Sequence, residues 1–110
     1  MVESSKCQNC EGSNYDTSTS SAYKQITDWE SYRSYGTCSF LGYNSTDEVY
    51  LTPSKTLGLK NFLWFLATDQ RGVGPASDGI MGMSRKYQTV RYQSGPLLIQ
   101  ELYMNVRTRD

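Results

Sequence analysis

Two extended runs around a glycine-containing turn restrict the fold of this chain more than any other feature. Residues 32–35 lead into a turn at residues 36–38, and residues 39–43 leave it. This pattern indicates a β-hairpin. Gly36 can adopt the positive φ angle that a tight turn requires, because it has no Cβ atom. The sequence therefore predicts an antiparallel strand pair with its turn at Gly36.

Three other segments have the pattern of strands. Residues 48–52 alternate polar and apolar side chains, and residues 61–68 include the longest apolar run of the chain. Residues 77–84 predict a buried strand that meets another backbone closely, because glycines stand at two of their positions. Residues 23–34 leave helix and strand open, because their apolar positions are spaced by three. The turn-rich segments, which predict loops, are residues 1–21, 69–75 and 85–95.

One helix is predicted near the carboxyl end, over residues 96–103. Pro96 suits the first helical position, and Ser94 can cap the helix. Residues 104–110 are polar and basic and predict a tail that frays. The apolar face of the helix would be formed by Leu98, Ile99 and Leu102.

Composition favours a mainly β fold and excludes several functions. The nine Tyr, three Phe and two Trp suit half-exposed strands, because tyrosine presents one apolar and one wet side. At 110 residues the chain is one domain at most, or part of one. Its 11 basic and 11 acidic residues balance, which gives no argument for nucleic acid as a partner. No apolar run approaches the roughly 18 residues of a membrane span, and the amino terminus has no apolar signal region.

The cysteines indicate a structural disulfide. Three cysteines without any histidine argue against zinc, which needs four such ligands. Cys7 and Cys10 flank a polar loop rather than opening a helix, which disfavours a redox site. A small disulfide between them in a secretory-pathway protein is the prediction. Asn44 begins a glycosylation sequon, Asn-Ser-Thr, which fits that compartment.

An ordered set of short motifs resembles the amino-terminal lobe of a pepsin-like aspartic protease. The set covers about residues 1–103, and its order and spacing carry the resemblance more than any single motif. The family has Trp-Val-Pro-Ser-x-x-Cys, then Tyr-Gly-Thr/Ser-Gly-Ser, then Asp-Gly-Ile-Leu-Gly-Leu. The matching segments here are Val2–Cys7 with Cys10, Tyr15–Lys24, Tyr35–Ser39, Gly42 with Asp47-x-Val49-x-Leu51, Phe62–Ala67 and Asp78–Met83.

The resemblance implies a partial lobe of the bilobal pepsin-like barrel over residues 1–103, with residues 104–110 as a tail. It implies a substrate-binding flap at the hairpin, whose residues are Tyr35, Gly36, Thr37 and Cys38. In that interpretation Tyr35 shapes the pocket, while Gly36 and Thr37 hydrogen-bond the substrate backbone. Cys38 stands where the family has glycine, so its side chain restricts φ. It is expected to be either a free thiol or an unpaired cysteine that reacts during isolation.

No catalytic residue is expected in this chain. The family's Asp-Thr/Ser-Gly triplet does not occur in the 110 residues and is expected upstream of Met1. The segment Asp16-Thr17-Ser18 looks similar, but serine lacks the backbone freedom of the third glycine. By resemblance Asp78 is structural too. The family implies neither a cofactor nor a metal.

Three hypotheses follow. The first is an incomplete lobe of an aspartic endopeptidase, inactive alone, whose full protein cleaves peptide or protein substrates and needs the missing lobe segments. By family it belongs to the secretory pathway, in a lysosomal, vacuolar or extracellular location, although this chain shows no signal peptide. The second is a catalytically inactive interaction or structural protein with a pepsin-like fold. The third is an unrelated small β-domain held by Cys7 and Cys10.

Overall fold

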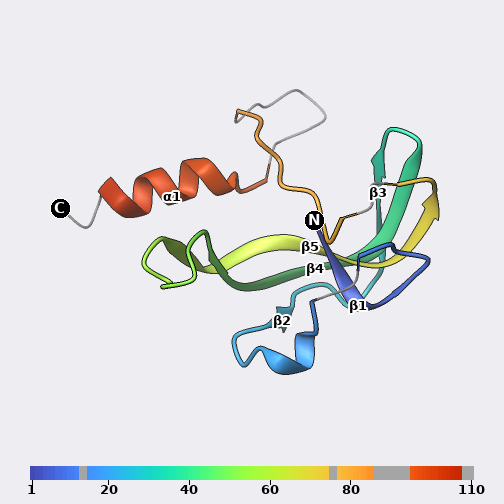
Figure 1. Ribbon diagram of the computed structural model, residues 1–110, viewed down its shortest axis with the longest axis horizontal. Helices are drawn as coiled ribbons and strands as arrows, with labels where there is room; N and C mark the ends of the chain where they lie inside the picture. The colour runs from blue at the N-terminus through green and yellow to red at the C-terminus, as the bar shows by residue number, and fades with distance from the viewer. Residues whose placement is uncertain (13–14, 75–76, 86–94, 108–110) are drawn as a thin grey trace. The chain divides into compact units, whose positions relative to one another are not determined.

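A computed structural model describes residues 1–12, 15–74, 77–85 and 95–107 of the chain (Figure 1). The chain forms two compact units. The first holds Met1–Asp47 and Leu63–Ile80, and the second holds Glu48–Phe62 and Met81–Asp110.

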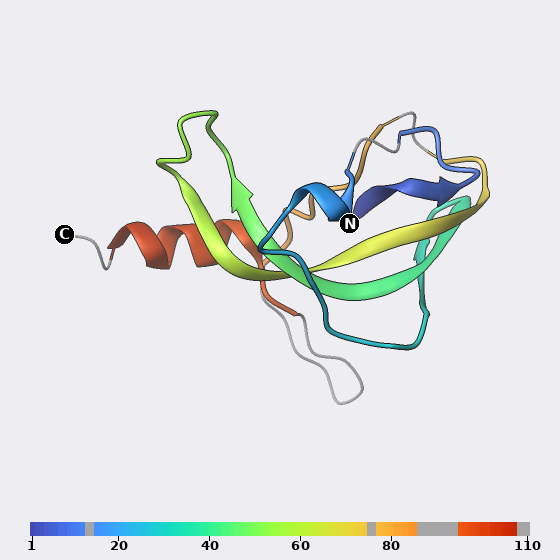
Figure 2. The same ribbon diagram turned by 90° about the horizontal axis from the view of Figure 1, so that it is seen from below.

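The strands join in one sheet, which confirms the prediction of a mainly β chain. The sheet order is β1-β5-β4-β2, and β3 also pairs with β4. β1 is parallel to β5, whereas β2 and β3 are antiparallel to β4. Figures 1 and 2 both show β4 and β5 running side by side. The strand bounds are β1 Val2–Gln8, β2 Lys24–Gln25, β3 Ser31–Tyr35, β4 Cys38–Tyr50 and β5 Gly58–Gly72.

The predicted hairpin is confirmed and consists of β3 and the start of β4. Its register runs from the pair Ser31 and Gly42 to the pair Tyr35 and Cys38. Gly36 lies in the turn with a φ angle of 59°, in the left-handed region that favours glycine. The segment of residues 23–34, left open by the sequence, holds strand β2 and all of β3 except its last residue, Tyr35.

The core of the first unit lies on one face of the sheet. Cys38, Phe40, Phe65 and Ala67 form a buried cluster, in which Phe40 and Ala67 are completely buried. Side chains alternate across a strand, so each strand contributes every second residue to this face. The Arg33 guanidinium carbon lies 4.8 Å from the centre of the Phe65 ring, a cation–π contact that covers the edge of the cluster.

The second unit contains the helix α1, Leu98–Arg107. Leu98 and Leu102 are buried, and their spacing places them on one face of the helix. The Asn105 side-chain amide donates a hydrogen bond of 2.9 Å to the Gly58 carbonyl, which ties the helix to the start of β5. Within the described residues, no helix has the length and apolar character to cross a membrane.

Strand β1 contradicts the predicted loop over residues 1–21. β1 pairs with β5 through Val2 opposite Leu66 and Glu3 opposite Ala67. The sequence of β1 is mostly polar, so the strand forms because β5 offers a partner and not because of its own pattern. A short 3-10 helix, η1 (Thr17–Thr19), lies in the same predicted loop.

The prediction for residues 77–84 is half correct. Val2 and Gly79 form a single β-bridge instead of a strand, and Met81 and Met83 are exposed. The expected close backbone approach is confirmed, because a Cβ atom on Gly79 would clash with the Met1 carbonyl oxygen. The second glycine, Gly82, has no such neighbour within the described residues.

Two boundaries also differ from the prediction. β5 continues to Gly72, although residues 69–75 were expected to be a loop. The helix begins at Leu98, after Pro96, and continues past residue 103 into the expected tail. Its buried face lacks Ile99, which is 47% exposed. The proposed cap Ser94 and most of the expected loop before it lie outside the described residues.

Replacing Phe40 by alanine should cost about 3–5 kcal/mol of unfolding free energy, because the residue is completely buried in the core. Denaturant unfolding of the variant and the parent chain measures the difference. Ile26→Ala is the control, since Ile26 is 55% exposed and its loss should cost less than about 0.5 kcal/mol. Equal losses for the two variants would contradict the placement of the core.

Candidate functional site

The hairpin tip brings the four predicted flap residues together. Tyr35 ends β3, Gly36 and Thr37 form the turn, and Cys38 begins β4. Gly36 and Thr37 are exposed, Tyr35 is half-buried and Cys38 is buried. The turn is thus exposed, while the flanking Tyr35 and Cys38 side chains pack at the core cluster.

Tyr35 is held by its neighbours on the hairpin. Its ring meets the Phe40 ring edge-on, with ring centres 5.9 Å apart and planes at 66°. Such an arrangement is favourable for aromatic pairs. The Cys38 thiol donates a hydrogen bond of 3.3 Å to the Tyr35 carbonyl. The position of Tyr35 is therefore fixed by the contact of its ring with Phe40 and by the hydrogen bond to its carbonyl.

Cys38 is a free cysteine and is only 4% exposed. Of the two expectations for this residue, the structure agrees with the free thiol. A thiol that reacts readily needs exposure to the reagent, which burial denies it. Cys38 acts as a small apolar residue of the core with one weak hydrogen bond.

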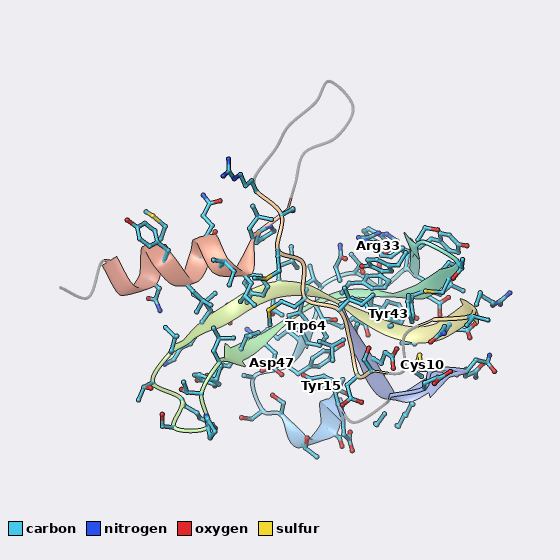
Figure 3. The ribbon with its side chains drawn as sticks, turned by 45° about the horizontal axis from the view of Figure 1, so that its top comes forward. Cys10, Tyr15, Arg33, Tyr43, Asp47 and Trp64 are labelled. Carbon is cyan, nitrogen blue, oxygen red and sulfur yellow. A yellow bond between two sulfur atoms is a disulfide. The ribbon has the colours of Figure 1, made fainter. Side chains whose placement is uncertain are left out.

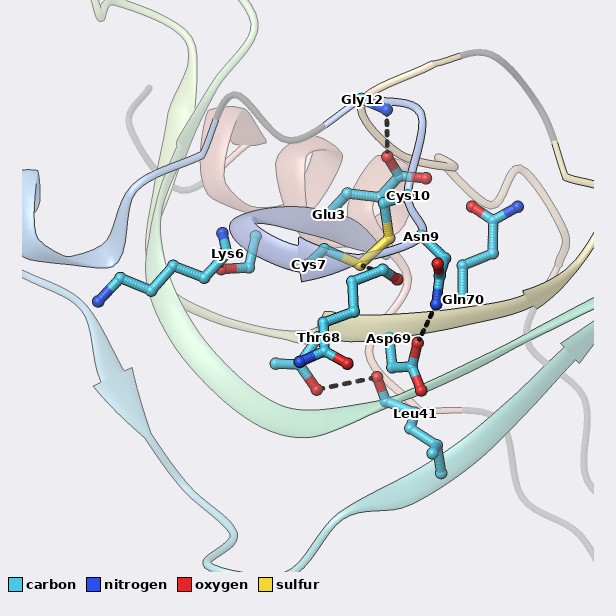
Figure 4. The surroundings of a disulfide bond; sticks show 12 residues. Glu3, Lys6, Cys7, Asn9, Cys10, Gly12, Leu41, Thr68, Asp69 and Gln70 are labelled. Carbon is cyan, nitrogen blue, oxygen red and sulfur yellow. Dashed lines mark hydrogen bonds between the residues drawn. A yellow bond between two sulfur atoms is a disulfide. The ribbon is translucent and has the colours of Figure 1, made fainter.

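The predicted disulfide joins Cys7 of β1 to Cys10, which follows the strand (Figure 4). Both cysteines pack against the core cluster. Asn9, inside the loop, donates a hydrogen bond of 3.3 Å from its side-chain amide to Asp69 on β5. The disulfide loop is thus fastened to the sheet.

Tyr15, Asp47 and Trp64 belong to a second group of aromatic and polar side chains (Figure 3). Trp64 directly precedes the core residue Phe65 on β5, so it faces the side of the sheet opposite the core cluster. The Tyr15 hydroxyl donates a hydrogen bond to the buried Asp47 carboxylate. Burial raises the pKa of Tyr15, and the bond to Asp47 raises it further. Tyr15 and Trp64 meet edge-on with ring centres 5.2 Å apart. This arrangement fixes Asp47 in a structural role.

A cavity of about 500 Å³ lies in the first unit and was not predicted from the sequence. Its charged lining residues come from three separate segments and are Lys6, Glu30, and the β5 pair Asp69 and Arg71. Asp69 and Arg71 form an ion pair of 3.1 Å. No local sequence signal could reveal this cavity, because it is assembled from distant parts of the chain.

A sequence model of the eukaryotic aspartyl protease family matches residues 1–108 of the chain. The chain belongs to this family. The mainly β sheet with one short helix agrees with one lobe of the pepsin-like fold. No curated protein matches the chain. Membership of this aspartyl protease family implies an aspartic-type peptidase, which acts on peptides.

The two aspartates that resemble catalytic residues have other contacts. In this aspartyl protease lobe, Asp16 accepts hydrogen bonds from the backbone N–H and hydroxyl of Ser18, at 2.9 and 2.7 Å, and caps η1. These bonds lower the pKa of Asp16. Asp78 is exposed, and its carbonyl accepts a hydrogen bond of 2.8 Å from the Glu3 backbone. Among the described residues there is no cluster of three metal-ligating side chains.

Asn44 of the predicted glycosylation sequon lies within β4. Its side-chain oxygen accepts a hydrogen bond of 3.4 Å from Arg33, and its backbone N–H donates one of 3.1 Å to the Thr27 hydroxyl. The next residue, Ser45, is completely buried. Glycosylation of Asn44 stays a prediction.

Glu3 is a buried carboxyl group that the sequence analysis missed. It is completely buried on β1, where the family motif has proline. One carboxyl oxygen accepts a hydrogen bond of 2.8 Å from the Gly12 backbone, and the other has no partner within the described residues. Burial raises the pKa of Glu3, and the nearby charges of Asp78 and Glu11 add to the rise against the effect of the Gly12 bond. The departure from proline was the available signal.

Glu3 makes the stability of the fold depend on pH. Because its pKa is higher in the folded chain, its favourable contribution is present below the unfolded pKa of about 4.3 and is lost as the pH rises through the folded pKa. Glu3→Gln keeps an oxygen for the Gly12 N–H but never ionises. The variant should therefore be more stable than the parent near pH 7 and similar to it near pH 4.

Denaturant unfolding at the two pH values tests this prediction. Glu30→Gln is the control, because Glu30 is exposed. The stability of the control should depend on pH as that of the parent does. If the stability of Glu3→Gln showed the same pH dependence, Glu3 would not be the source of that dependence.

Proposed function

We propose that the β3–β4 hairpin acts as the flap of an aspartic-type endopeptidase and covers an extended peptide. The observation that carries this proposal is the hairpin tip itself. Gly36, with a φ angle of 59°, and Thr37 are exposed residues at the turn. The half-buried Tyr35 stands beside them, braced by Phe40.

The roles in peptide binding follow from this geometry. The backbone of Gly36 and Thr37 would hydrogen-bond the main chain of the peptide, which gives affinity without selecting side chains. The ring of Tyr35 would contact a peptide side chain. Because its position is fixed in advance, little conformational entropy is lost when the peptide binds.

Hydrolysis needs groups beyond these 110 residues. An aspartic protease uses two carboxylates that share one proton, one to activate water and one to protonate the carbonyl. The Asp-Thr/Ser-Gly triplet that supplies such a carboxylate is absent from the sequence. Three of its aspartates have other partners. The Asp16 carboxylate accepts a hydrogen bond from Ser18, that of Asp47 accepts one from Tyr15, and that of Asp69 forms an ion pair with Arg71. We therefore propose that this chain contributes peptide binding and no catalytic group.

The compartment follows from the family and from the disulfide. The Cys7–Cys10 bond persists only where thiols are oxidised, as in the secretory pathway and beyond the cell. A secretory, lysosomal or vacuolar, or extracellular location is accordingly proposed. Peptide or protein substrates are the proposed partners.

The purified 110-residue chain should not cleave peptides. A fluorogenic peptide at acidic pH, with and without the inhibitor pepstatin, provides the measurement, and a complete aspartic protease in parallel verifies the assay. Pepstatin-sensitive cleavage by the chain would show that a catalytic pair exists within it, contrary to the proposal.

Peptide binding itself is tested with pepstatin as an extended peptide-like probe, followed by the amide resonances of residues 35–38. Tyr35→Ala should weaken binding by about tenfold, as expected for an aromatic side chain buried by a ligand. Tyr32→Ala is the control, because Tyr32 lies on the same strand and is 58% exposed.

The two variants test whether the hairpin belongs to the peptide site. Binding without cleavage, with loss on Tyr35→Ala, fits the flap and equally fits an inactive pepsin-like interaction protein. If both variants still bound pepstatin as the parent does, the hairpin would not be part of the peptide site.

A further inference from the structure

The tip of the hairpin touches the turn that follows β5. The Thr37 hydroxyl donates a hydrogen bond of 3.0 Å to the Val73 carbonyl. Gly72 has a φ angle of 85°, and a Cβ atom built on it would lie 2.5 Å from the Thr37 carbonyl oxygen. The two backbones therefore pass too closely for any side chain to stand between them.

The Cys38 sulfur lies next to the same turn. A Cβ atom on Gly74 would lie 3.2 Å from the sulfur, so Cys38 occupies the space next to the backbone of residue 74. The same thiol donates its hydrogen bond to the Tyr35 carbonyl. Cys38 is thus in contact with the turn on one side and with the strand that carries Tyr35 on the other.

The turn of residues 72–74 is itself held in place. Gln70, which is 4% exposed, donates a hydrogen bond of 3.3 Å to the Gly72 carbonyl. Its side-chain amide also lies against the backbone of Gly74. The buried Gln70 side chain therefore fixes the position of the turn against which the hairpin tip packs.

We propose that Thr37 and Cys38 clamp the hairpin tip onto the turn of residues 72–74, and that the two act as positioning residues for Tyr35. The tip then leaves the turn only when the Thr37–Val73 hydrogen bond breaks and the thiol becomes exposed. A glycine at residue 38, as in the family motif, has no side chain to form the second half of this clamp. The consequence for peptide binding rests on the proposed function, whereas the clamp does not.

Because the clamp buries the Cys38 thiol, the reactivity of this thiol reports the opening of the hairpin tip. Cys38 is the free thiol of the chain, since Cys7 and Cys10 form the disulfide. A thiol reagent such as an aromatic disulfide reaches the sulfur only when the tip opens. The rate of labelling of the oxidised chain therefore measures the fraction of open molecules.

The experiment compares four chains: the parent, Thr37→Val, Thr37→Ser and Thr19→Val. Thr37→Val removes the hydroxyl and should raise the labelling rate about threefold to tenfold. Thr37→Ser keeps a hydroxyl and should restore the parent rate. Thr19→Val is the matched control, because the Thr19 hydroxyl also donates to a backbone carbonyl, that of Asp16, at an exposed position.

Global unfolding is kept apart from local opening by measuring labelling over a range of low urea concentrations. Opening of the tip exposes little surface, so the rate should rise only weakly with urea, whereas global unfolding depends on it steeply. Unfolding midpoints of all four chains, measured in parallel, correct for any change in overall stability.

Two results would overturn the clamp. One is a parent chain that labels as fast as the same chain in full denaturant. The other is a Thr37→Val rate equal to the parent rate once stability is corrected. Because no peptide is present, slow labelling that Thr37→Val accelerates supports the clamp even if Tyr35→Ala leaves pepstatin binding unchanged.

Discussion

The parallel pairing of β1 with β5 is the constraint on which most of the first unit depends. It joins Val2 to Leu66 and Glu3 to Ala67, residues that lie far apart in the sequence. Closing so long a loop costs conformational entropy that only the finished sheet repays. The pairing brings the disulfide loop against the core and buries the Glu3 carboxyl group. It also brings the segment around Gly79 beside Met1.

Local signals predicted the parts of the fold whose partners are close in sequence. The β3–β4 hairpin needed only two extended runs and a glycine able to adopt positive φ. The Cys7–Cys10 disulfide needed only a short loop between two cysteines. β1 was missed for the opposite reason: its polar residues carry no strand pattern, and the partner that makes it a strand is distant. The true extent of β5 was missed because Asp69 and Gly72 resemble loop residues within a strand.

The candidate site was predictable to the same degree. The four residues of the tip are contiguous, so a motif could identify them together. What Cys38 contacts could not be predicted, because residues 72–74 meet it only in the folded sheet. The burial of Glu3 could not be predicted either, because the departure from the family's proline marks the position but does not tell that the carboxyl group is buried. In this aspartyl protease lobe a short motif thus identifies the residues of the hairpin tip, whereas their contacts depend on parts of the chain that are distant in sequence.

The packing of Tyr15 and Tyr23 around Trp64 has an optical consequence. The ring centres of the two tyrosines lie 5.2 and 6.2 Å from that of Trp64, close enough for excitation of either phenol to pass to the indole. The other tryptophan, Trp29, is 65% exposed and emits as a solvated indole does. Emission after tyrosine excitation therefore comes disproportionately from Trp64. The protein carries an intrinsic fluorescent probe of the sheet face opposite its core.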